Sequence, residues 1–102
     1  MNTSNDFNKI SQDNMTVREY EKQKIASKIS IEIMKIRINK DWSQAKLAKQ
    51  ANLKKSVIND IEIKAELPDL DILVRIIHAL GARLIITPND IKIAEIKKLR
   101  ES

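Results

Sequence analysis

The run from Trp42 to Glu62 most constrains what this chain folds into, because its apolar residues follow two short helical periods. The first period covers residues 43–51 and the second covers residues 55–63. Only a tight turn fits between them, and the second helix has one apolar side and one polar side. The pattern predicts a pair of helices whose second member can lie in the major groove of DNA.

The composition favours a small helical domain and excludes several kinds of site. The chain has 102 residues with one glycine and two prolines, which favours helices over turn-rich β structure. It lacks cysteine, so a disulfide framework and a thiolate zinc site are excluded. His78 is the single histidine, which excludes a multi-histidine metal site. It lies in the apolar fourth helix, where we expect a core-edge or interface residue and not a member of a Ser/His/Asp set. We therefore expect no enzymatic activity and no cofactor.

Positive charge is concentrated on the two-helix unit. Residues 34–64 hold eight basic and three acidic residues, whereas residues 65–90 hold two basic and four acidic ones. A surface that binds DNA phosphates needs such a concentration, although a solvated lysine-rich surface gives the same counts. No segment is long and apolar enough to span a membrane, and no signal pattern is present. The expected location is the cytoplasm.

Capping residues predict where the helices begin and end. Residues 1–15 are rich in Asn, Ser and Asp and are expected to be flexible. Thr16 and Glu19 form a capping box, which predicts a long helix ending near Ile38. Further caps are expected at the starts of the second and fourth helices and at the end of the fourth: Ser43, Asp69 and Gly81.

A β-branched run after the fourth helix predicts one short strand, which Pro88 ends. A single strand leaves its hydrogen-bonding groups unpaired. We therefore expect it to pair with the same strand of a second copy across a two-fold axis, the alternative being an ordinary extended segment. Residues 90–102 are expected to form a short basic helix capped by Asp90, or to fray. The dimerising strand consists of Arg83, Leu84, Ile85, Ile86 and Thr87.

Together these elements predict a mainly α fold of five helices with one short C-terminal dimerising strand. Residues 1–15 form a flexible segment. Residues 16–82 form a DNA-binding domain with an extended first helix, and residues 83–102 form the strand and a basic tail.

The N-terminal end of the second helix of the unit is expected to read bases, because that end approaches the base edges. Lys55 could donate to guanine, Asn59 could pair with adenine or reach a phosphate, and Asp60 could accept from cytosine. Val57 could touch a thymine methyl group. The alternative for each of these residues is a solvated surface position that makes no contact with DNA. The residues expected to contact bases are Lys55, Ser56, Val57, Asn59 and Asp60.

Phosphate contacts are expected near the start of the first helix of the unit, where backbone amides favour an anion. Trp42 is expected to pack between the first two helices rather than to stack on a base. Arg37 and Glu62 are expected to form a structural ion pair between the first and third helices. The phosphate-contacting candidates are Ser43, Gln44, Lys46, Lys54 and Lys64, with Lys49 as a further one.

These residues resemble the Xre/Cro family, the helix-turn-helix domains of the lambda-type repressors. The resemblance implies a lambda-repressor-like fold in which Gln44 binds phosphate and Arg37 and Glu62 form a buried pair. It also implies base-facing roles for Lys55, Ser56, Asn59 and Asp60. It covers about residues 30–82 and rests on Trp42-Ser43-Gln44, Leu47-Ala48, Ile58, Ile61-Glu62, Pro68 and Leu80-Gly81.

The chain departs from the pattern of this family at five positions. Asn52 and Asp41 stand where glycine is common, and asparagine tolerates the left-handed conformation. Lys54 replaces the usual Ser or Thr cap. Ile63 stands where a phosphate-contacting Asn is frequent, and Asp60 replaces a common Arg or Gln, bringing negative charge towards DNA.

The chain also shows a narrower resemblance, to the HigA-type antitoxins. The HipB antitoxin has a similar DNA-binding domain, which is followed by a dimerising strand. This resemblance rests on a preceding helix with Glu19-Tyr20-Glu21, then the domain, then Leu80–Pro88. It implies a homodimer that binds an operator in double-stranded DNA, represses its own operon and neutralises a RelE/HigB-like ribonuclease toxin by direct binding. The alternatives are a stand-alone Xre/Cro-type repressor of phage or chromosomal origin and a protein-interaction module.

Overall fold

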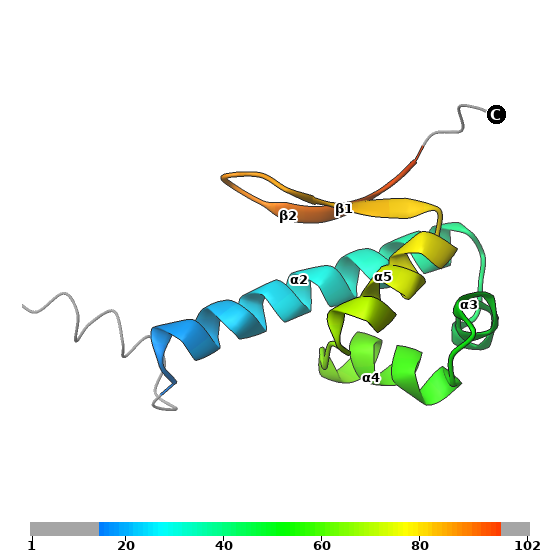
Figure 1. Cartoon of the computed structure of the whole chain (residues 1–102), viewed down its shortest axis with the longest axis horizontal. Helices are drawn as coiled ribbons and strands as arrows, with labels where there is room; N and C mark the ends of the chain where they lie inside the picture. Colours follow the sequence, from blue (N-terminus) through cyan, green and yellow to red (C-terminus); the bar gives the residue numbers. More distant parts are fainter. Residues whose placement is uncertain (1–14, 97–102) are drawn as a thin grey trace, which may run out of the picture.

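The computed structural model describes residues 15–96, which form four α-helices followed by a two-stranded hairpin (Figure 1). The long helix α2 lies between the hairpin on one side and α3 and α4 on the other (Figure 1). Predictions made for residues 1–14 and 97–102 lie outside the described residues. The elements are α2 (Val17–Asn39), α3 (Gln44–Ala51), α4 (Lys55–Lys64), α5 (Leu70–Ala79), β1 (Ala82–Ile86) and β2 (Ile91–Glu95).

Side-chain caps begin three of the four described helices. The Thr16 hydroxyl accepts from the Glu19 amide and the Glu19 carboxylate accepts from the Thr16 amide, both at 3.1 Å. Ser43 and Asp69 each accept from the amide three residues further on, at 2.9 and 3.0 Å. These predicted caps are confirmed. Lys54, at the cap position of α4, makes no side-chain cap, because a lysine offers no acceptor.

Positive φ values close the turns between the helices. Gly81 has φ 67° after α5, as predicted for its terminal position, while Asp41 and Asn52 have φ 64° and 60°. Asp and Asn adopt this left-handed conformation more readily than other side chains. Ala65 also adopts it, with φ 53°, at a cost of about 1 kcal/mol relative to glycine. The turns therefore fix the direction of each helix relative to the previous one.

One apolar core joins the C-terminal half of α2 to α3, α4 and α5. Ser30 is buried in it, and its hydroxyl donates to the carbonyl oxygen of Ile61, which ties α2 to α4. Because all four described helices share this core, α3 and α4 form a rigid unit. The largest fully buried side chains are Ile33, Leu47, Ile58, Ile61, Ile76 and Leu80.

The C-terminal region corrects the expectation of a fifth helix and a single strand. Within the segment predicted as a basic helix, Ile91–Glu95 forms the strand β2, which pairs antiparallel with β1 of the same chain. Thr87 and Asp90 close the intervening turn, with the Thr87 amide donating to the Asp90 carbonyl at 2.8 Å. Pro88 lies at a central turn position, where its fixed φ is favourable. Pro88 thus follows the end of β1, as predicted, and forms part of the turn that leads into β2.

Burial against α2 explains why this segment is a strand. Ile91 and Ile93 alternate with the exposed Lys92, a two-residue period that suits a half-buried strand. Ile93 is only 4% exposed and belongs to the core. Its amide donates to the Glu32 carboxylate of α2 at 3.3 Å. A helix over these residues would leave β1 unpaired.

Candidate nucleic-acid interface

A bidentate ion pair between Arg37 and Glu62 joins α2 to α4. Arg37 Nε lies 2.7 Å from Glu62 Oε2, and Arg37 Nη2 lies 2.8 Å from Glu62 Oε1. The two side chains are only 13% and 1% exposed. The hydrogen bonds to Glu62 raise the pKa of the Arg37 guanidinium, although partial burial acts in the opposite direction. Arg37 therefore stays charged. The two hydrogen bonds between the guanidinium and the carboxylate are short, and both groups are largely shielded from water.

The same ion pair orients the start of α3. Arg37 Nη1 donates to the Trp42 carbonyl at 2.7 Å, and the Trp42 amide donates to the Arg37 carbonyl at 3.1 Å. Gln44 Nε2 donates to Glu62 Oε1 at 3.1 Å. Among residues 15–96, one amide hydrogen and the carbonyl oxygen of the Gln44 side chain have no hydrogen-bond partner. Gln44 is thus fixed at the N-terminal end of α3, where a phosphate would be favoured.

The polar side of α4 carries four of the residues predicted to contact bases. Lys55 and Ser56 are exposed at its first turn, and Asn59 and Asp60 are half-buried one turn later. Residues spaced by three or four lie on one helical face, so these side chains form one surface. We call it the recognition face: Lys55, Ser56, Asn59 and Asp60.

Two further features modify the recognition face. Asp60 Oδ1 lies 3.5 Å from Lys64 Nζ on the next turn, which offsets the negative charge that Asp60 would bring towards DNA. The side chains of Asp60 and Lys64 are 42% and 58% exposed, so water screens the pair and it contributes little to stability. Val57 packs against the core instead of standing free. Only part of the Val57 side chain is therefore available for the predicted contact with a thymine methyl group.

The structure separates the predicted phosphate-contacting residues into two groups. Ser43, Gln44 and Lys46 lie together in the first turn of α3, and Lys54 is exposed at the start of α4. Lys64 lies at the opposite end of α4, about 14 Å along the helix from its start. Ser43, Gln44 and Lys46 therefore form one site, which we call the α3 site. The hydrogen bond from Gln44 to Glu62 places it beside the C-terminal half of α4, whereas Lys54 and Lys64 lie at opposite ends of α4.

Arg75 is a positioning residue that sequence reasoning missed. Its Nη2 atom donates to the carbonyl oxygens of Ala51 and Asn52, at 3.1 and 2.8 Å. These carbonyls belong to the end of α3 and the turn before α4, so Arg75 satisfies groups that the helix leaves unpaired. The signal was present in the sequence as a lone arginine within the apolar helix α5. It holds the turn that sets the angle between α3 and α4.

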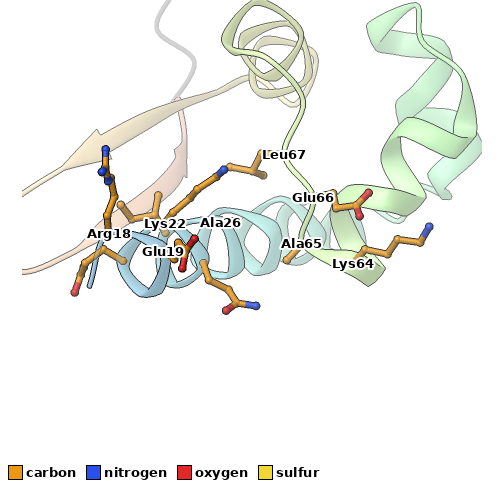
Figure 2. Close-up of a pocket in the computed structure, with 11 residues that line it drawn as sticks. Arg18, Glu19, Lys22, Ala26, Lys64, Ala65, Glu66 and Leu67 are labelled. Atoms are coloured by element: carbon orange, nitrogen blue, oxygen red, sulfur yellow. The ribbon is translucent and has the colours of Figure 1, made fainter. Parts of the chain in front are cut away.

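An open groove of about 740 Å³ lies between the N-terminal half of α2 and the end of α4, where Lys64 lines it (Figure 2). Side chains of the N-terminal half of α2, including Arg18 and Lys22, line one wall, and residues 64–67 line the other. Within residues 15–96, no group of His, Cys, Asp and Glu side chains is arranged to hold a metal ion. None of the helices in this range is long and apolar enough to cross a membrane.

Comparison with known proteins identifies the fold of this unit. The helix-turn-helix family model HTH_3 matches residues 33–85, which is more than half of the chain. No curated protein and no solved structure gives a significant match. The matched segment begins in the last third of α2 and ends in β1. It contains the recognition face, the α3 site and the Arg37–Glu62 pair.

Replacing Arg37 with Met should lower the free energy of unfolding by about 3–5 kcal/mol, because Glu62 keeps a buried carboxylate without its cation. Urea denaturation followed by circular dichroism measures the change. The Arg37→Met/Glu62→Met variant is the matched control, since it removes both charges and should recover a large part of the loss. A double variant no more stable than Arg37→Met would contradict this explanation.

Proposed function

We propose a specific role for this chain, which belongs to the Xre-like helix-turn-helix family of sequence-specific DNA-binding regulators. It acts as a homodimeric antitoxin that represses its own operon and neutralises a RelE/HigB-like ribonuclease toxin by direct binding. The observation that carries the DNA-binding part is the recognition face, which projects from a rigid two-helix unit beside the fixed Gln44 side chain. The dimer and the toxin complex rest on two further surfaces.

The recognition face supplies the chemistry for reading bases. Lys55 offers an ammonium donor suited to guanine, Asn59 offers a donor and an acceptor suited to adenine, and Asp60 offers an acceptor suited to cytosine. Gln44 and Lys46 contact the phosphates and set the position of α4 on the duplex. The shared core and the Arg37–Glu62 pair hold both sets in one orientation. Such preorganisation limits the entropy lost on binding.

The outer edge of β1 supports a homodimer. Hydrogen bonds from Thr87 to Asp90 and from Ile96 to Gly81 place the odd-numbered residues of β1 in the pairs that bond to β2. Leu84 and Ile86 therefore direct their backbone groups outward. Carboxylates cover the corresponding edge of β2, through Glu32 and Asp90. Within residues 15–96 no side chain donates to or accepts from the outer edge of β1, so a second copy of β1 can pair there.

Two segments outside the family match form a second surface, which supports toxin binding. The first 16 residues of α2 precede residue 33, and β2 follows residue 85. They pack on each other, with Lys28 Nζ 3.6 Å from Asp90 Oδ1 and the Ile93 amide bonded to Glu32. This surface lies on the side of α2 away from α4 (Figure 1). A toxin bound there would leave the recognition face free.

Substituting both Lys55 and Asn59 by Ala should abolish base discrimination while leaving the fold and the oligomeric state unchanged. Selection of bound duplexes from a random-sequence library should give a two-fold symmetric site with the unsubstituted chain. The double variant should lose at least tenfold in preference for that site over random DNA, since each lost base contact costs about 1–3 kcal/mol. Lys92→Ala, on the hairpin, is the control. Retained preference in the double variant would refute the placement of these residues.

Replacing Ile86 with Pro should convert the dimer to a monomer, as measured by light scattering. Its amide faces outward and its side chain is 70% exposed, so proline removes a donor for the second copy without breaking the hairpin. Ile86→Ala keeps the amide and should remain dimeric. Ile85→Pro, in contrast, should unfold the hairpin itself. A dimer that survives Ile86→Pro would exclude pairing through β1.

Co-expression with the tagged product of the neighbouring reading frame tests the antitoxin role. We expect the two proteins to co-purify and the toxic effect of the partner on growth to be relieved. The Lys55→Ala/Asn59→Ala variant should still relieve toxicity, because the proposed toxin surface lies elsewhere. A neighbouring product that is neither toxic nor bound would contradict the antitoxin role and leave a stand-alone repressor.

A further inference from the structure

Two ammonium groups lie over one indole ring at the start of α3. Lys40 Nζ is 5.2 Å and Lys46 Nζ is 5.7 Å from the centroid of the Trp42 ring, both within the range of a cation–π interaction. Trp42 is half-buried and packs against the core, and hydrogen bonds to Arg37 hold its backbone on both sides. The Trp42 ring is therefore held in place, and two flexible lysine side chains contact it.

The two lysines differ in their charge partners. Lys40 Nζ lies 3.5 Å from Glu95 Oε2 of β2, so its charge is offset. Across residues 15–96, no carboxylate oxygen lies within 4 Å of Lys46 Nζ. The exposed Lys46 stands in the first turn of α3, which contains no acidic residue. A cation is disfavoured there by the positive end of the helix dipole, and the indole offsets that repulsion.

We propose that Trp42 is a positioning residue for DNA binding, which holds the Lys46 ammonium group against a backbone phosphate. The phosphate lies at the N-terminal end of α3, beside Ser43 and Gln44, and this inference rests on the proposed DNA-binding function. A free lysine side chain loses considerable rotamer entropy when it is ordered. Contact with the indole orders Lys46 before DNA arrives. Lys40 takes no part, because Glu95 already neutralises it.

The salt dependence of binding to a mixed-sequence DNA duplex separates these roles, since it counts phosphate contacts without an operator. The full chain is titrated onto a fluorescein-labelled duplex at several KCl concentrations, and anisotropy gives Kd. Lys46→Gln removes a charge and should reduce the slope of log Kd against log salt by about 0.9 per protomer. Trp42→Leu keeps that charge and should retain the slope, but it should raise Kd severalfold at each salt concentration, because Lys46 is then ordered only on binding. In the Lys46→Gln background, Trp42→Leu should raise Kd no further. Trp42→Phe, which keeps an aromatic ring, and Lys40→Gln should retain both the Kd and the slope of the unsubstituted chain.

Each alternative outcome overturns a distinct statement. An unchanged Kd in Trp42→Leu, or an equal increase of Kd when Lys46 is already Gln, removes the positioning role. An unchanged slope in Lys46→Gln removes the phosphate contact. A reduced slope in Lys40→Gln would show that Lys40 also contacts a phosphate, and would contradict the statement that its pairing with Glu95 prevents this. No salt-dependent binding by the unsubstituted chain contradicts the proposed DNA binding itself.

If the Trp42→Leu variant does not fold, NMR of the unsubstituted chain still tests whether the indole contacts Lys46. In the unsubstituted chain, the indole ring current should shift the ε-methylene protons of Lys46 upfield in the NMR spectrum. The corresponding protons of Lys49, on the same helix, should keep ordinary shifts. Ordinary shifts at Lys46 would overturn the proposal.

Discussion

The ion pair between Arg37 and Glu62 connects the end of α2 with α4, and through its remaining hydrogen bonds it also fixes the start of α3. Glu62 is almost completely buried, so its carboxylate needs both Arg37 and Gln44 as partners. The same requirement holds Gln44 at the N-terminal end of α3. An electrostatic constraint in the interior thus sets the position of the Gln44 side chain relative to the recognition face on α4.

The family domain and its additions divide the molecule into two sides. The recognition face and the α3 site lie on one side of α2, and the hairpin lies on the other (Figure 1). Glu32 is central to the second side, because it accepts from the Ile93 amide and lies 3.5 Å from Lys35 Nζ. This arrangement would let one chain combine the proposed DNA-binding surface with an independent surface for the proposed second copy or toxin. The proposed antitoxin role requires such a division.

Charge on the DNA side is arranged with local compensation. Lys64 offsets Asp60, and Glu95 offsets Lys40, so the net positive charge of the unit remains at particular positions. Lys46, Lys54 and Lys55 are exposed around the first turns of α3 and α4. The placement of the remaining positive charge, more than its total, distinguishes this surface from a generally solvated lysine-rich one.

Local chemistry made much of the fold predictable. The caps at Thr16, Ser43 and Asp69 involve side chains within three residues of the amides they satisfy, so the sequence contains all that is needed to place them. The left-handed residue Asn52 and the terminal Gly81 are equally local. The periodicity of Leu47, Ala48, Ile58 and Ile61 likewise predicted the buried sides of α3 and α4, and so the polar face of α4.

The strand β2 was not predictable in the same way. Its five residues pair with β1 and cover α2, and neither contact is visible in a local pattern as short as Ile91–Glu95. Asp90 can cap a helix or end a turn, and only the pairing partner decides between them. The clamp from Arg75 to the turn after α3 and the placing of Lys40 and Lys46 over Trp42 also join distant residues.

The sequence by itself therefore determined the helices, their caps and the amphipathic face of α4, because those depend on neighbours within one or two turns. Tertiary structure alone decided that residues 82–95 form a hairpin. It also decided that, among residues 15–96, side chains cover the outer edge of β2 but not that of β1, and that Lys40 has a carboxylate partner whereas Lys46 has none. Those features depend on which distant groups satisfy a hydrogen bond or a charge, and a linear pattern does not specify such partners.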